Sequence, residues 1–195
     1  PVSDDGFQIA GHLFRREAGR MVSSLVRVLG MSYLTLAEDA VQDALVRALE
    51  TWKFGHMPEN PAAWLMRVAR NRAVDLLRRQ AHLDRGVPQV ILALESMHAE
   101  ADLDVGEHVI ADDELRLMFS CCDPDLARPA QVAVILKYLC GFSVREIAQA
   151  FLSSEAAVEK QLFRCRRALE ERGELFEVRD AEQVRARLPA VQSAI

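Results

Sequence analysis

A strongly acidic stretch divides this 195-residue chain and limits how it can fold. Residues 82–114 carry nine acidic side chains against a single basic one, Arg85, whereas residues 1–81 and 115–172 each carry a net charge of +2. Uncompensated charge of one sign resists compaction and is typical of solvated linkers. The pattern therefore predicts two compact units, residues 1–81 and 113–172, joined by an acidic linker over 82–112 and followed by a tail over 173–195.

Composition excludes several classes of protein. Half of the residues are apolar, which is enough to bury a core, while 9 Gly, 7 Pro and 6% aromatic residues speak against a turn-rich all-β fold. No apolar run approaches the roughly 18 residues of a membrane-spanning helix. The four cysteines lack regular spacing, which is typical of a reducing compartment, and we expect a cytoplasmic protein with no membrane contact.

Helix signals fill both blocks. Thr35 precedes Glu38 by three residues, a capping box that predicts a helix from Ala37 to about Trp52. Asn60 followed by Pro61 predicts the start of another helix. Further helices are expected over 7–29, 61–79, 113–122 and 129–140. The apolar run 87–94 alone resembles a strand, but it would have no partner in its acidic surroundings. The sequence therefore predicts an all-α fold.

The helix over 61–79 places polar groups on one face. At 100° per residue, Trp64, Arg70, Asn71 and Arg78 all lie within about 60° of the direction of Arg67. Guanidinium groups bind phosphate, an asparagine amide can pair with a base edge, and an indole can stack on an unpaired base. The face therefore indicates nucleic-acid binding. The alternative is an ordinary solvated face with Trp64 packed in the core.

The segment 143–172 has helix-turn-helix spacing. A capping box of Ser143 and Glu146 opens a short helix, a tight turn follows at 152–153, and Ser154 caps a longer helix. In that longer helix, apolar residues recur in a 4-3-4 pattern, and the residues opposite them are Ala156, Lys160, Phe163, Arg164 and Arg167. Such a helix fits the major groove of DNA. The missing turn glycine leaves open an unrelated antiparallel helix pair.

Together, three segments resemble bacterial extracytoplasmic-function (ECF) sigma factors, the promoter-recognition subunits of RNA polymerase. They are residues 37–52 (AEDAVQDALVRALETW), residues 64–79 (WLMRVARNRAVDLLRR), and the run from Ser143 to Arg167, in the family's order. The resemblance implies two small helical domains, region 2 over 1–81 and a winged-helix-like helix-turn-helix region 4 over 113–172, joined by the acidic linker.

The resemblance also implies roles for individual residues. The first segment would dock on the clamp coiled coil of the polymerase core through Asp39, Gln42, Asp43 and Glu50. The second would read the −10 element, with Asn71 near a flipped base, Trp64 as a stacking wall or as core, and Arg67, Arg70, Arg78 and Arg79 on the backbone. The third would read the −35 element through Ser154, Ala156, Lys160, Gln161, Phe163, Arg164 and Arg167.

These implications leave no catalytic residue in the chain, because the polymerase performs nucleotide transfer. We expect no cofactor and no metal, since adjacent Cys121 and Cys122 do not have CxxC ligand spacing. Partners would be core polymerase, promoter DNA and either an anti-sigma factor or a C-terminal extension. The vicinal cysteines and the tail 185–191 resemble a subgroup with that extension, which predicts that this chain is a fragment. Two alternatives remain: a dimeric one-component helix-turn-helix regulator and a protein-binding helical adaptor.

Overall fold

The computed structural model describes residues 4–52, 57–80, 87–101, 107–173, 175 and 181–194. Within these ranges there is no strand, so the all-α prediction is confirmed. The helices are α1 (Asp4–Leu29), the 3-10 helix η1 (Met31–Tyr33), α2 (Leu34–Trp52), α3 (Pro61–Gln80), α4 (Val87–Ala101), α5 (Glu107–Cys121), α6 (Arg128–Tyr138), α7 (Val144–Ala150), α8 (Glu155–Arg172) and α9 (Ala181–Ala194). No helix in the described part of the chain is both long and apolar enough to cross a membrane.

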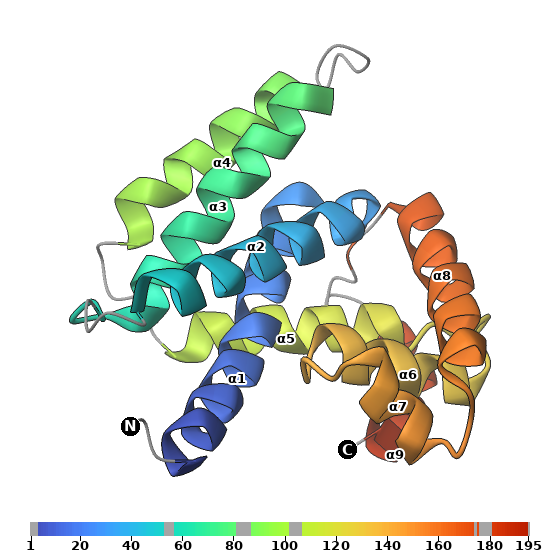
Figure 1. Cartoon of the computed structure of the whole chain (residues 1–195). Helices are drawn as coiled ribbons and strands as arrows, with labels where there is room; N and C mark the ends of the chain where they lie inside the picture. The colour runs from blue at the N-terminus through green and yellow to red at the C-terminus, as the bar shows by residue number, and fades with distance from the viewer. Residues whose placement is uncertain are drawn as a thin grey trace.

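The first half of the fold is built on α2 and α3, which pack extensively on each other, with α1 against both. Helix α4 turns back along α3, so that the two lie side by side as a helical hairpin (Figure 1). Residues 87–94, which resemble a strand in composition, are therefore helical, in agreement with the all-α prediction. Val87 and Leu94 are buried on one side of α4. A short apolar run has the same composition in a strand and in a buried helix, and here α3 supplies the surface that it covers.

The second half contains α5 to α9. Helix α5 crosses α1, and α6 packs on α7 and α8, which form the predicted helix-turn-helix. Helix α9 lies against α5 and α6. Helix α5 begins six residues earlier than predicted, at Glu107, inside the stretch that charge alone marks as a linker.

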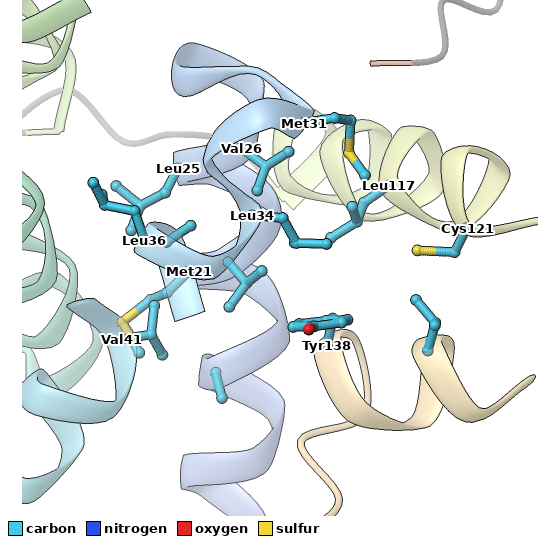
Figure 2. Close-up of a cluster of buried hydrophobic side chains, with 14 of the residues drawn as sticks. Met21, Leu25, Val26, Met31, Leu34, Leu36, Val41, Leu117, Cys121 and Tyr138 are labelled. Carbon is cyan, nitrogen blue, oxygen red and sulfur yellow. The ribbon is translucent and has the colours of Figure 1, made fainter. Parts of the chain in front are cut away.

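The two halves share one hydrophobic core. Figure 2 shows Met31 of η1 and Leu34 at the start of α2 facing Leu117 and Cys121 of α5 and Tyr138 of α6. All five are buried, with 3% exposure or less. The two units are therefore packed together in this structure rather than separated by a tether.

The predicted capping box at Thr35 is wrong, whereas three other predicted helix starts are confirmed. Helix α2 begins at Leu34, and both the backbone N–H and the hydroxyl of Thr35 donate to the carboxylate of Glu170 in α8. The first N–H groups of a helix are usually satisfied by side chains close in the sequence, but here a side chain from a distant helix accepts one of them. The confirmed caps are Asn60, Ser143 with Glu146, and Ser154.

Candidate nucleic-acid interfaces

Helix α3 presents part of the predicted reading face. The amide N–H of Ala63 donates to Asn60 Oδ1 at 3.0 Å, which sets the start of the helix. Arg67 and Asn71 lie about one turn apart on the same face of this helix, and both are exposed, as is Arg79 near the end of the helix. These three residues remain available to a nucleic acid.

Arg70 does not belong to that exposed surface. Its side chain is 2% exposed, and Val74, which neighbours it on the same flank, is 6% exposed. Helix α4 packs along α3, and its Glu95 accepts from Arg78 Nη2 at 2.9 Å. The assignment of Arg70 to a DNA backbone contact is therefore corrected for this conformation. The helical period of α3 predicts one packed side, and the burial of Arg70 and Val74 shows that packing extends onto part of its polar face.

Trp64 is half-buried and engaged inside the protein. Its ring centroid lies 5.5 Å from that of Trp52, whose ring lies 5.7 Å from Phe14. Tilted rings at these separations are favourable packing pairs. The indole of Trp64 therefore joins α3 to α2 and α1, next to the exposed face rather than on it.

Helix α8 has the two faces that its sequence predicts. Val158, Leu162, Cys165 and Leu169 form the buried stripe. On the other side, the exposed residues are Ala156, Lys160, Phe163, Arg164 and Arg167, while Gln161 is half-buried and Ser154 is the N-cap. Arg167 Nε donates to Glu171 at 2.8 Å. An exposed basic helix face of this kind is suited to the major groove.

Phe163 is the unusual member of this face. Its side chain is 55% exposed, and the guanidinium of Arg166 lies 5.7 Å from its ring centroid. A cation over an aromatic face stabilises the position of the ring. Phe163 is thus held outward as an apolar contact surface among basic groups.

The turn between α7 and α8 is closed without glycine. Leu152 adopts a left-handed backbone conformation, with φ of 51°, and its side chain is 96% exposed. The N–H of Ser153 donates to the Ala148 carbonyl at 2.9 Å, which ends α7. The absence of a turn glycine therefore does not prevent a helix-turn-helix.

Glu146 links the capping box of α7 to α1. The Ser143 amide and hydroxyl donate to its carboxylate at 2.9 and 2.8 Å, and Arg15 Nη2 donates at 2.7 Å. The donors on Ser143, assisted by Arg15, hold the pKa of Glu146 below its ordinary value.

Glu146→Gln is expected to lower the free energy of unfolding by about 0.5 kcal/mol at pH 7, because it removes a charge from a helix N-terminus and from Arg15. A carboxyl with a lowered pKa stabilises the fold above its ordinary pKa and loses this effect as pH falls through the folded value. Urea unfolding at pH 7 and pH 3 should therefore show the difference between wild type and variant shrinking at the lower pH. A difference that is independent of pH would contradict this.

The predicted polymerase-docking residues lie on one exposed side of α2. Asp39, Gln42, Asp43 and Glu50 are all exposed, and Asp43 pairs with Arg72 of α3. Partial desolvation of its carboxyl, with Glu38 next to it, raises the pKa of Asp39 although the residue is exposed. A surface hollow between α2 and α3 borders this side, lined by Asp43, Val46, Arg47, Glu50, Val68, Arg72 and Asp75.

Sequence reasoning missed the apolar part of this surface. Val46 is 53% exposed and Leu49 is 44% exposed, beside the carboxylates. Both residues lie outside the buried stripe of α2 on the helical period, and this position could have indicated from the sequence that they are exposed. The α2 surface thus combines exposed acidic groups with exposed aliphatic groups.

The cysteines offer no ready thiolate. Burial raises the pKa of Cys122 to about 11 and that of Cys121 further, so both are protonated near neutral pH. Among the residues whose side chains the structure describes, no group of three or more His, Cys, Asp or Glu side chains is arranged to hold a metal ion.

Exposed basic groups on α3 and a helix-turn-helix with an exposed basic helix are the features of a helical DNA-binding protein. Known proteins narrow the class. The Sigma-70 region 2 family model matches residues 13–83, and the Sigma-70, region 4 model matches residues 125–169. No solved structure matches the chain.

Relatives agree with the family models. ECF RNA polymerase sigma factor SigX of Bacillus subtilis (strain 168) is 26% identical over 146 residues, 71% of each protein. The probable RNA polymerase sigma factor RfaY of Xanthomonas campestris pv. campestris is 28% identical over 130 residues, 67% of this chain and 32% of that protein. An uncharacterized protein of Rhizobium meliloti (strain 1021) is 42% identical over 164 residues, 83% of this chain and 38% of that protein.

The chain belongs to the ECF sigma factors of the sigma-70 family, which confirms the resemblance drawn from its three motifs. It spans 38% and 32% of the lengths of the R. meliloti and X. campestris relatives. Its family is not one of enzymes.

Proposed function

We propose that this chain binds bacterial core RNA polymerase in the cytoplasm and directs promoter-specific initiation. The observation that carries the proposal is that two separate helices, α3 and α8, each present exposed basic and base-pairing groups, while α2 presents an acidic and apolar surface. The domain boundaries follow the same proposal: region 2 over 1–81, linker over 82–112, region 4 over 113–172 and the start of an extension over 173–195.

On α3, we assign the −10 contacts to Asn71 for a base and to Arg67 and Arg79 for phosphates. Arg78 would join them on exchanging its Glu95 partner for a phosphate, because both are exposed and exposed ion pairs are weak. Trp64 would act as a wall behind Asn71. Extruding a base costs a few kcal/mol, which edge hydrogen bonds and packing must offset.

On α8, we assign the −35 contacts to the residues around Phe163. Lys160, Arg164 and Arg167 would neutralise phosphates or pair with guanine, and Phe163 would meet a thymine methyl group. Ser154 and Ala156, at the start of the helix, would lie closest to the groove floor, with Gln161 at its margin. Glu159 and Gln161 lie at positions where the family often has basic residues. The −35 DNA sequence that this chain prefers would therefore differ from the sequences preferred by its relatives.

Core polymerase would bind α2 through Asp39, Gln42, Asp43 and Glu50. The exposed Val46 and Leu49 add apolar area to this contact. The net charge of −5 fits a protein that relies on the polymerase for most of its electrostatic attraction to DNA. The polymerase would also perform the nucleotide chemistry, so we assign no catalytic residue. The remaining partner would be either an anti-sigma factor or a C-terminal extension of this chain itself.

Run-off transcription with bacterial core polymerase tests the proposal. Promoter-specific transcript should appear only when the chain is added, and Asn71→Ala or Arg164→Ala should each lower it about tenfold, the equivalent of about 1.4 kcal/mol. The controls Arg128→Ala and Gln89→Ala remove an exposed arginine on α6 and an exposed amide on α4, and should leave transcription unchanged. If core is neither bound nor redirected while the chain binds paired half-sites as a dimer, the one-component regulator replaces this proposal.

A further inference from the structure

The turn between α7 and α8 has the hydrogen bonds of a Schellman motif, with leucine at the position that usually holds glycine. The N–H of Leu152 donates to the Gln149 carbonyl at 3.2 Å. The N–H of Ser153 donates to the Ala148 carbonyl at 2.9 Å. These two bonds end a helix when the residue between the donors is left-handed, and Leu152 has φ of 51°. No other non-glycine residue in the described part of the chain has a positive φ.

The leucine side chain does not stabilise the fold in a way that would offset this conformation. The left-handed region brings Cβ too close to the backbone of an L-residue, whereas glycine adopts it freely. Packing of the side chain could compensate, but Leu152 is 96% exposed. Glycine or asparagine would therefore suit the folded chain better at this position, and the leucine indicates a contact with a molecule outside the chain.

The place of the turn in the fold indicates which molecule that is. Leu152 lies two residues before Ser154, the N-cap of α8, and residues 149–157 are all exposed. The end of α8 approaches α2, where Glu170 accepts from Thr35, whereas its start lies at the opposite end of the helix, away from α2 and α3 (Figure 1). A recognition helix contacts base edges through its N-terminal residues. The turn that leads into α8 would therefore lie at the edge of the same groove.

The chemistry of the turn favours an apolar group of DNA over a phosphate or a protein. Glu155 is exposed in the first turn of α8, and its carboxylate repels phosphate from this end of the helix. Leu152 and Phe151 are exposed among small and polar residues, so their apolar area is far below the roughly 800 Å² per partner of a stable protein interface. The apolar group that base pairs present in the major groove is the C5-methyl group of thymine.

We infer that Leu152 is a specificity-determining residue that contacts a thymine methyl group at the edge of the −35 element. The inference rests on the proposed function and gives the helix-turn-helix a second apolar base contact in addition to Phe163. Ser154 and Phe163 are separated by about 14 Å of helix, at 1.5 Å per residue. Leu152 and Phe163 therefore meet different base pairs.

Leu152→Gly and Leu152→Asn should change stability and DNA binding in opposite senses, because both relieve the backbone and both remove the apolar side chain. The melting temperature, followed by circular dichroism, should equal that of wild type or exceed it by about 2 °C. With core polymerase bound, affinity for a duplex carrying a −35 sequence obtained by in vitro selection should fall about fourfold. Leu152→Met keeps an apolar side chain and should retain the affinity. A melting temperature lowered in both variants would show that the side chain supports the fold and would overturn the inference.

Leu92→Asn is the matched control, because Leu92 is also an exposed leucine but lies in the right-handed backbone of α4. Asparagine is a poorer helix former than leucine, so this variant should have a lower melting temperature. Its affinity for the −35 duplex should equal that of wild type.

Deoxyuridine substitution identifies the contact, because replacing one thymine of the −35 duplex by deoxyuridine removes only the C5-methyl group. Wild type should lose about fourfold in affinity at one thymine to whose methyl group Leu152→Gly is insensitive. Phe163→Ala should become insensitive to a different thymine. If Leu152→Gly stays sensitive to every methyl group that wild type senses, the inference is overturned.

The same titrations separate this inference from the proposed function. If the chain and core together select no promoter duplex, the proposed function fails and this inference fails with it. If wild type and Leu152→Gly bind the selected duplex equally well with core, the inference alone fails. If Leu152→Gly weakens the binding of core in the absence of DNA, Leu152 contacts a protein, and the thymine contact is overturned.

Discussion

Replacing Leu34 by alanine is expected to lower the free energy of unfolding of the whole chain by about 3 kcal/mol. Leu34 is fully buried where the start of α2 meets α5 and α6, so the change removes apolar contacts and leaves a cavity between both halves of the fold. Urea unfolding followed by circular dichroism measures the effect. Leu92→Ala is the matched control, because Leu92 is 68% exposed and its loss should cost about 0.5 kcal/mol or less.

The shape of the transition carries further information. Because Leu34, Leu117 and Tyr138 belong to one cluster, wild type and Leu34→Ala should each unfold in a single transition. Two transitions, of which Leu34→Ala shifts only one, would contradict a core shared by the two halves.

On the recognition helix, Phe163→Ala and Lys160→Ala are expected to weaken promoter binding for different reasons. With core polymerase bound, Phe163→Ala should lower affinity about tenfold on the preferred −35 sequence and much less on altered sequences, because an apolar base contact is lost. Lys160→Ala should lower affinity on all sequences alike and reduce the salt dependence by about one ion, because a phosphate contact is lost.

Titrating labelled promoter duplexes at several salt concentrations separates these two behaviours. The two side chains lie three positions apart on one helix and are both exposed, so each serves as the other's control. If Phe163→Ala weakened binding equally on every duplex, its role would be to support α8 through Arg166 rather than to read a base. If Lys160→Ala left the salt dependence unchanged, Lys160 would not contact phosphate.

Interactions between residues close in the sequence were enough to predict where several of the helices begin. Asn60, Ser143 and Ser154 begin helices because their side chains accept hydrogen bonds from amides three residues ahead, an interaction that needs no distant partner. The buried stripe of α8 follows from helical period alone. These features also carried the family resemblance, which depends on short segments in a fixed order.

Distant partners decided the rest. The apolar run 87–94 resembles a strand in its composition, but it forms helix α4 packed on α3. Arg70 of α3 is buried, which its place on the polar face of the helix does not predict. Thr35 has the sequence of a local cap, but Glu170 binds it from α8 across 135 residues.

The sequence by itself therefore determined where α3, α7 and α8 begin and which residues face outward on α8, because caps and periodicity act within a few residues. Only the tertiary structure decided that the two halves close on each other at Gly19. A glycine inside a helix is unfavourable on local grounds, and its reason becomes visible only when the Leu139 backbone lies against it.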